Sequence, residues 1–158
     1  MIAFFATGLI VKETTYTTKV TVDRPIDTVF STLVDVNNMQ EWVKDIKSIE
    51  VVNSTQNITG SVYKITVDNQ GYDVEMTQKV EAFEPNEKVT YFYDADNMLK
   101  TDTYKFSTTN NKTIISKTSV CRSDSYVMSC IFPYFKGTFQ EIDQQYLDDF
   151  KEFIEKNN

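Results

Sequence analysis

At 158 residues, of which 41% are apolar, the chain is long enough to bury a substantial core within one domain. Its 23 acidic and 16 basic residues give a net charge of -7, which argues against nucleic-acid binding and against strong association with an anionic membrane. The sequence contains no histidine, so it excludes Ser-His-Asp and Cys-His catalysis and lacks the commonest zinc ligand.

The N-terminal segment, residues 1–13, stands apart because its first eleven residues are almost wholly apolar. This run is too short to span a bilayer, and it lacks the basic start of a signal peptide. The favoured interpretation is a segment that packs on the domain, while a signal or lipid-facing segment stays open as the alternative. We therefore treat residues 1–13 as a segment of uncertain role and residues 14–158 as one domain.

Residues 14–43 predict one strand followed by two short helices. Alternation of apolar and polar side chains over residues 14–22 is typical of a half-buried strand. Asp23 is expected to cap a helix that has Pro25 near its first position and a buried face through Leu33. A second short helical turn, residues 39–43, carries Trp42, the only tryptophan.

Six further strands follow, joined mostly by short turns. The polar segment 68–71 ends in Gly71, which can adopt a positive φ, and it therefore predicts a hairpin. Short turns between successive strands favour an antiparallel meander, with one wet and one buried face. The predicted strands are residues 46–52, 60–67, 72–83, 89–93, 99–107 and 113–122.

The last segment, residues 132–158, predicts a long amphipathic helix with an aromatic stripe. Apolar side chains recur at steps of three and four, and the intervening residues, Asp143 among them, form an acidic face. A stripe this aromatic requires a partner, so the sheet is expected to wrap around this helix. The stripe consists of Phe135, Phe139, Ile142, Tyr146, Phe150 and Phe153.

Cys121 and Cys130 are too few for a disulfide framework, and they have neither CxxC spacing nor a histidine partner. We interpret them as two buried or half-buried thiols in a reducing compartment. This interpretation predicts a cytoplasmic location.

The order of motifs along residues 14–156 resembles the START-like, Bet v 1-like (SRPBCC) superfamily, which includes polyketide cyclase/dehydrase-type proteins. The resemblance includes a polar-Pro step at Pro25, a Val-Phe pair at Val29 and Phe30, and a second helix that carries Trp42. It implies an α+β helix-grip fold: a curved seven-stranded antiparallel sheet around a long C-terminal helix, with two short helices after the first strand. The matching segments are residues 20–35, 38–42, 46–52, 60–63, 80–91 and 142–155.

The superfamily hosts several functions, so the fold alone does not decide between them. Because the predicted inner faces are aromatic, the leading hypothesis is binding or carriage of a small hydrophobic molecule, such as a lipid or polyketide, in an internal cavity. A cyclase, aromatase or dehydratase, in which Tyr91 or Tyr104 donates a hydrogen bond to a carbonyl or enolate, is the first alternative. A co-chaperone-like interaction module is the second, although the Trp that marks one co-chaperone branch before the last helix is missing.

The inward residues of the predicted strands and helix define the candidate ligand site. Gln78 is the most informative, because a buried amide needs either a hydrogen-bond partner or a filled space beside it. The last strand is expected to face inwards through Ile114, Thr118 and Val120. We nominate no catalytic residue, metal or cofactor, favour a binder over an enzyme and predict no oligomeric state. The candidate residues are Trp42, Tyr63, Tyr72, Met76, Gln78, Tyr91, Tyr104, Phe106, Thr118, Phe135, Phe139 and Ile142.

Overall fold

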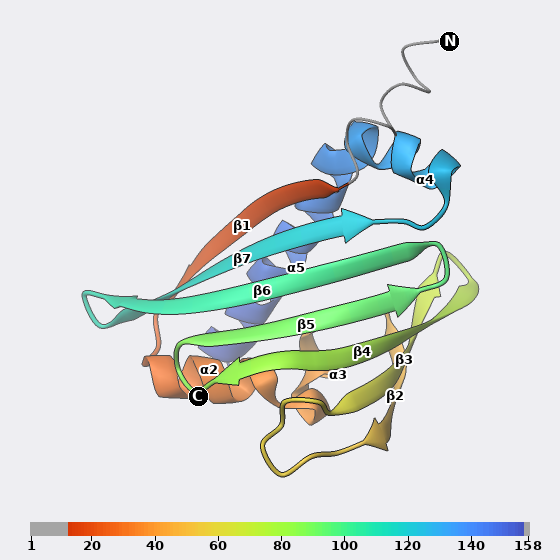
Figure 1. The fold of residues 1–158 in the computed structure, drawn as a ribbon. Helices are drawn as coiled ribbons and strands as arrows, with labels where there is room; N and C mark the ends of the chain where they lie inside the picture. The colour runs from red at the N-terminus through yellow and green to blue at the C-terminus, as the bar shows by residue number, and fades with distance from the viewer. Residues whose placement is uncertain (1–12, 157–158) are drawn as a thin grey trace.

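A computed structural model describes residues 13–156, in which a curved sheet of seven antiparallel strands wraps around one long helix (Figure 1). The predicted helix-grip architecture is therefore confirmed, while the apolar N-terminal segment lies almost wholly outside the described residues. The strands are β1 (Thr14–Val22), β2 (Ile46–Asn53), β3 (Val62–Asn69), β4 (Tyr72–Glu84), β5 (Lys88–Ala95), β6 (Met98–Thr109) and β7 (Lys112–Arg122).

The strand order is β1-β7-β6-β5-β4-β3-β2, so the chain forms a meander from β2 to β7 and β1 adds to its far edge. Consecutive strands β1 and β2 thus lie at opposite edges of the sheet. The helices α2 (Ile26–Val34), η1 (Val36–Asn38) and α3 (Met39–Trp42) connect them and close one end of the fold (Figure 1). Helix α2 begins after Pro25, which takes the cap position that the sequence had assigned to Asp23.

Two tight turns depend on residues that tolerate a positive φ. Gln70 and Gly71 have φ of 55° and 91° between β3 and β4, and Asn110 and Asn111 have φ of 47° and 62° between β6 and β7. Glycine and asparagine adopt this left-handed region at low cost, and such turns match the twist of a hairpin. The hairpin expected at Gly71 is present.

The C-terminal segment is broken into three helices rather than one. These are α4 (Tyr126–Ile131), η2 (Phe132–Phe135) and α5 (Lys136–Lys156). The prediction of a continuous helix from Phe132 is therefore wrong for its first four residues. Pro133 lies in the first turn of η2, where its missing N–H costs little. No helix within residues 13–156 is long and apolar enough to cross a membrane.

Helix α5 covers the free edge of the sheet as well as one of its faces. The Gln144 side chain accepts a hydrogen bond from the Lys19 backbone N–H at 3.2 Å and donates one to the Lys19 carbonyl at 3.1 Å. Gln140 donates to the Thr17 carbonyl at 3.0 Å. These contacts satisfy edge groups of β1 that would otherwise be open to another strand.

The buried face of α5 is rotated from the predicted aromatic stripe. Asp143, Leu147, Phe150 and Ile154 are buried, whereas Ile142 is 47% exposed. Phe135, which precedes α5, is 49% exposed. The predicted stripe and the set of buried residues both follow steps of three and four. Because the buried set includes the charged Asp143, the sequence pattern did not identify it as a buried face. The structure buries Asp143 because lysines from the sheet face it.

The hydrophobic core fills the space between the sheet, α2 and the second half of α5. Phe30 packs edge-on against Phe83 and Phe106, with ring centroids 5.3 and 5.0 Å away. The ring of Trp42 packs in the same way on Phe150, at 5.1 Å. Such edge-to-face pairs fix the end of the fold at which α5 is anchored.

Candidate functional site

A cavity of about 310 Å³ separates the sheet from the first half of α5. Its walls come from all seven strands, α2, α3 and α5, and they are mostly apolar, with Leu33, Ile65, Val67 and Met76 among them. Small-molecule sites span about 300–1,000 Å³, so this cavity is at the lower end of that range. Its lining of apolar side chains with a few polar ones is the usual composition of such a site.

Four charged side chains form one wall of the cavity: Lys100 and Asp102 of β6, Lys117 of β7 and Asp143 of α5. We call them the charge tetrad. Each side chain is at most 15% exposed. Two lysines and two aspartates give the tetrad a net charge of zero, which is the condition under which buried charges are tolerated.

The tetrad is held together by short contacts. Lys100 Nζ lies 2.8 Å from both carboxylate oxygens of Asp143 and 3.4 Å from Asp102 Oδ2. Lys117 Nζ lies 2.9 Å from Asp102 Oδ2 and 3.0 Å from Asp143 Oδ1. Every charge therefore has two partners of opposite sign, and the two ammonium groups direct their protons at aspartates.

Strand register explains how residues far apart in sequence meet here. Tyr16 pairs with Ser119 across β1 and β7, and Ser119 pairs with Asp102 across β7 and β6. These three side chains thus form one row on the inner face of the sheet. Asp143 of α5 lies over this row and accepts hydrogen bonds at its Oδ2 from Tyr16 Oη at 2.8 Å and Ser119 Oγ at 2.9 Å.

The contacts shift the pKa values of the tetrad. Burial alone would raise the pKa of Asp143, but Lys117, Lys100 and the Tyr16 hydroxyl outweigh it and lower that pKa to about 2. Burial lowers the pKa of Lys100 and of Lys117, and the two aspartates more than offset this, so both lysine pKa values are raised. Asp143 and both lysines are therefore charged at neutral pH.

The low pKa of Asp143 predicts a loss of stability in acid. Because this pKa is lower in the folded chain than the ordinary value of 3.8, the charged group stabilises the fold fully above about pH 5. That contribution, about 2 kcal/mol, is lost as pH falls through 3.8 toward 2. Urea unfolding of wild type and Asp143→Asn at several pH values measures it. Their difference in unfolding free energy is expected to shrink by this amount in acid, and a pH-independent difference would contradict the assignment.

Two polar atoms that belong to cavity-lining residues have no hydrogen-bond partner within residues 13–156. They are Asp102 Oδ1 and the indole Nε1 of Trp42. The hydroxyls of Tyr91, Tyr93 and Tyr104, which also line the cavity, make no hydrogen bond to another described side chain. Burial raises the pKa of all three phenols, so they stay protonated and can donate.

The two cysteines are free and buried, as predicted. Cys121 lines the cavity with its Sγ 3.9 Å from Tyr16 Oη, and burial raises the pKa of its thiol. A thiol with a raised pKa is a poor nucleophile. Within the described part of the chain, no three Asp, Glu or Cys side chains gather in a way that would hold a metal ion.

Half of the residues nominated from the sequence line the cavity, three of them on strands β4 to β6 and three on helices α3 and α5. Three of the others lie in or against the hydrophobic core: Tyr63, Gln78 and Phe106. The Oε1 of Gln78 is buried without a partner among the described residues. The nominated residues that line the cavity are Trp42, Met76, Tyr91, Tyr104, Phe139 and Ile142.

The inward placement of three other nominated residues is wrong. Tyr72 is 79% exposed, because it lies at the start of β4, beyond the part of the sheet that α5 covers. Phe135 is exposed in η2. Thr118 lies on the outer face of β7, where its hydroxyl is 3.4 Å from that of Thr17. The inward set on β7 is the alternate one, which includes Ile115.

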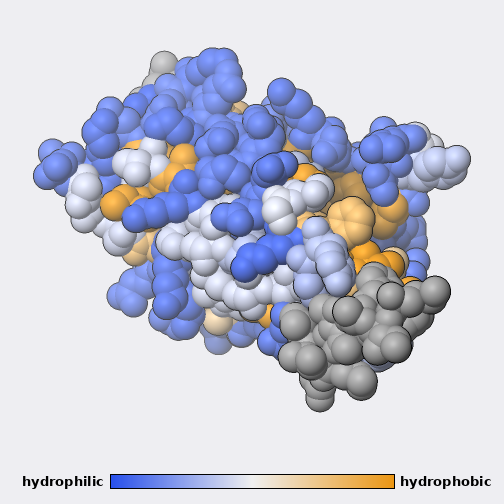
Figure 2. All heavy atoms as spheres, turned by 90° about the horizontal axis from the view of Figure 1, so that it is seen from above, coloured by the Kyte–Doolittle hydropathy of each residue, from blue (hydrophilic) through white to orange (hydrophobic). Residues whose placement is uncertain are grey.

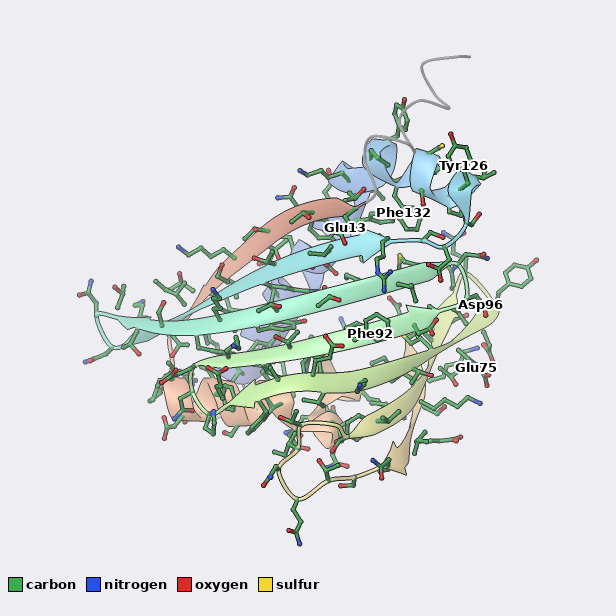
Figure 3. All side chains as sticks on the ribbon, viewed as in Figure 1. Glu13, Glu75, Phe92, Asp96, Tyr126 and Phe132 are labelled. Carbon is green, nitrogen blue, oxygen red and sulfur yellow. The ribbon has the colours of Figure 1, made fainter. Side chains whose placement is uncertain are left out.

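Sequence reasoning missed the whole tetrad and Tyr16. It left open whether Tyr93 or Phe92 faces inwards, and the structure places Tyr93 in the cavity lining. The sequence contained a signal for Lys100 and Asp102. They lie four and two residues before Tyr104 on β6, so the two-residue period of a strand places them on the same face as Tyr104, which was expected to face inwards. In β5, Tyr91 and Tyr93 line the cavity, whereas Phe92 between them lies on the sheet face turned away from α5 (Figure 3). For Lys117 no signal favoured burial, since a lysine inside a sheet is rare without a partner.

Comparison with known proteins gives one family match over most of the chain. The model of the family described as "Polyketide cyclase / dehydrase and lipid transport" matches residues 13–127. No curated protein sequence matches the chain.

Solved structures share the fold at low sequence identity. The START superfamily protein from Mycobacterium smegmatis superposes with a TM-score of 0.75 at 14% identity, over 91% of this chain and 99% of that one. Ara h 8.0201 gives 0.73 at 14%, over 92% and 99%. The Zhui aromatase/cyclase from Streptomyces sp. R1128 gives 0.67 at 14%, over 87% and 93%. At these identities the likeness establishes the fold alone.

Proposed function

The chain belongs to the polyketide cyclase/dehydrase and lipid transport family, and from this premise we propose that it binds or carries a small hydrophobic molecule in the cavity between the sheet and α5. The observation that carries the proposal is the cavity itself, which is apolar on most of its walls and lies between packed core on one side and the charge tetrad on another. A ligand that buries about 200 Å² of apolar surface there would gain about 5 kcal/mol by area, before the costs of association.

The size of the cavity favours a compact ligand. Its volume of about 310 Å³ is at the lower end of the range for small-molecule sites. This suits a molecule of one to three fused rings, or a single short chain, better than a lipid with two long chains. Tyr146, which lines the cavity from α5, donates to Asp45 at 3.1 Å and fixes the helix to the α3–β2 connection at this end.

The proposal is tested by native mass spectrometry and thermal-shift screening with fatty acids, sterols, quinones and flavonoids. We expect a one-to-one complex with a subset of these compounds. A ligand present at about 100 times its Kd adds about 2.7 kcal/mol to the free energy of unfolding, so its effect on Tm is measurable. If none of the four classes binds, the proposed function is wrong.

Filling the cavity is expected to abolish binding. Ala95 of β5 lines the cavity, and the change Ala95→Trp places an indole in the space that the ligand needs. The expected result is loss of the ligand-induced rise in Tm, with a folded circular-dichroism spectrum. Asp94→Trp is the matched control, because the exposed Asp94 precedes it on the other face of the strand. Equal ligand shifts in both variants would place the ligand elsewhere.

An enzyme of the cyclase, aromatase or dehydratase type is a second candidate. The observation that favours it is the set of free, protonated phenols on the cavity wall, two of which belong to Tyr91 and Tyr104. Such a donor stabilises a developing enolate if the substrate carbonyl lies within hydrogen-bond distance. Turnover of a polyketide-like substrate that is unchanged in Tyr91→Phe and Tyr104→Phe would remove this candidate.

We further propose that residues 14–158 act as one domain in the cytoplasm. The free state of Cys121 and Cys130 supports this location, since oxidising compartments favour disulfides and the cytoplasm is reducing. Localisation of a fluorescent fusion tests it.

A further inference from the structure

We infer that the ligand is an uncharged hydrophobic molecule with a hydroxyl group, and that the charge tetrad end of the cavity binds this hydroxyl. The inference rests on the proposed function, and it names the chemical class of the ligand. Three properties of the tetrad support it: its charge balance, the unpaired oxygen of Asp102 and the phenols beside it.

The charge balance disfavours an acidic ligand. Both ammonium groups are already neutralised, since Lys100 contacts both oxygens of Asp143 at 2.8 Å and Lys117 contacts Asp102 at 2.9 Å. Lys117 also lies over the ring of Tyr104, with its Nζ 5.3 Å from the centroid. A carboxylate in this cavity would lose its hydration and find no positive charge without a partner. A cationic ligand meets the same obstacle with the opposite sign.

The unpaired oxygen of Asp102 requires a donor. Its Oδ2 lies 2.9 Å from Lys117 Nζ and 3.4 Å from Lys100 Nζ, while its Oδ1 is buried without a hydrogen-bond partner among the described residues. A buried carboxylate oxygen without a donor is costly, because the charge has left water on that side. A hydroxyl can donate to Oδ1, whereas a ketone, an ether or a hydrocarbon cannot.

Phenols next to the tetrad supply the complementary donor. Tyr93 and Tyr104 line the same cavity as Asp102, and the charge of Asp102 contributes to raising the pKa of both phenols. Their hydroxyls make no hydrogen bond to a described side chain, so one of them can donate to the oxygen of the ligand. A hydroxyl is the small uncharged group that donates and accepts at once, and it fits this pair of needs.

The test compares three probes of the same shape on the wild-type protein: naphthalene, 2-naphthol and 2-naphthoate. Isothermal titration calorimetry at neutral pH, where the naphthol is neutral and the naphthoate is an anion, gives the affinity of each. We expect 2-naphthol to bind about tenfold more tightly than either of the others, which is the effect of one hydrogen bond to a charged group. In a crystal structure of the complex, the naphthol oxygen is expected within hydrogen-bond distance of Asp102.

The results separate this inference from the proposed function. If naphthalene binds as tightly as 2-naphthol, or 2-naphthoate binds best, the inference is overturned and the proposed function stands. Binding of none of the three overturns the inference as well. The proposed function then falls with it only if the wider ligand screen also finds nothing.

A variant tests the role of the tetrad charge directly. Asp102→Asn leaves the tetrad with a net charge of +1, so the preference is expected to move from 2-naphthol toward 2-naphthoate. Asp96→Asn is the matched control, because Asp96 is exposed in the β5–β6 turn (Figure 3) and does not itself line the cavity. An unchanged preference in Asp102→Asn overturns the inference. If that variant does not fold, Tyr93→Phe and Tyr104→Phe are the second test: at least one should weaken 2-naphthol several-fold and leave naphthalene unchanged, and no change in either overturns the inference.

Discussion

Replacing Asp143 with alanine is expected to lower the free energy of unfolding by about 3–5 kcal/mol. The change removes the partner of two buried lysines. It also removes the acceptor to which the Tyr16 and Ser119 hydroxyls donate. Lys100 and Lys117 would then share Asp102 alone, which leaves one buried positive charge without a partner. In a chain of this length such a loss lowers Tm by roughly 6–20 °C.

Urea and thermal unfolding of Asp143→Ala measure this effect, with Glu141→Ala as the control. Glu141 lies on the same helix, is exposed and is expected to change stability by no more than about 0.5 kcal/mol. A cost below about 1 kcal/mol in Asp143→Ala would mean that the lysines are solvated and that the tetrad does not exist as described. The comparison isolates the buried charge because both variants remove an acidic side chain from α5, one of them buried and the other exposed.

A buried cluster of charges is not by itself a device for stability. Well-packed apolar residues of similar volume often stabilise a fold as well or better, because charges lose their hydration on burial. In this chain the tetrad lies beside apolar cavity walls, where leucine or methionine would serve the core equally well. Its placement at the cavity is the one that the ligand recognition proposed above requires.

The strands could be predicted because most of them have one wet and one buried face. β1 alternates so regularly that its predicted bounds, 14–22, are those of the structure. In β4 the same alternation placed Met76 and Gln78 inwards correctly. Helix ends were less accurate, since Pro25 takes the cap position expected for Asp23, and η2 occupies the first four residues of the helix predicted from Phe132.

The site could be predicted only where its residues are apolar or aromatic. Period-two alternation cannot choose between the faces of β7, because both carry apolar side chains: Ile114 and Val120 on one, Ile115 and Cys121 on the other. The inward face is decided by Lys117, whose burial depends on aspartates from β6 and α5. A pairing between three distant segments leaves no mark in the local pattern of any one of them.

An exposed aromatic side chain misled the interpretation of the terminal helix, because Phe135, which was assigned to the buried stripe, is exposed in η2. Val127 of α4 and Tyr134 of η2 are exposed as well. Viewed from above, Figure 2 shows apolar side chains on this surface of the molecule. An apolar residue in the sequence is therefore not sufficient evidence for a buried side chain, because folded proteins expose much apolar surface.

Replacing Phe150 with alanine is expected to cost about 3–5 kcal/mol, the usual range for a buried phenylalanine. Its ring is fully buried at the anchored end of α5 and packs edge-on against Trp42 at 5.1 Å. Removing it leaves a void that the rigid sheet on one side and α3 on the other cannot close. Chemical denaturation, with the change in tryptophan fluorescence as a second signal, measures the loss.

Phe135→Ala is the matched control, and it also tests which face of the terminal segment is buried. The aromatic stripe seen in the sequence makes Phe135 and Phe150 equivalent, so it predicts similar costs for both. The structure places Phe135 half in solvent, with a tilted ring contact to Phe139 at 6.5 Å between centroids. We therefore expect a cost below about 1 kcal/mol for Phe135→Ala. Equal losses of unfolding free energy in the two variants would mean that the predicted stripe is the buried face of the helix. Asp143 would then not lie in the cavity wall.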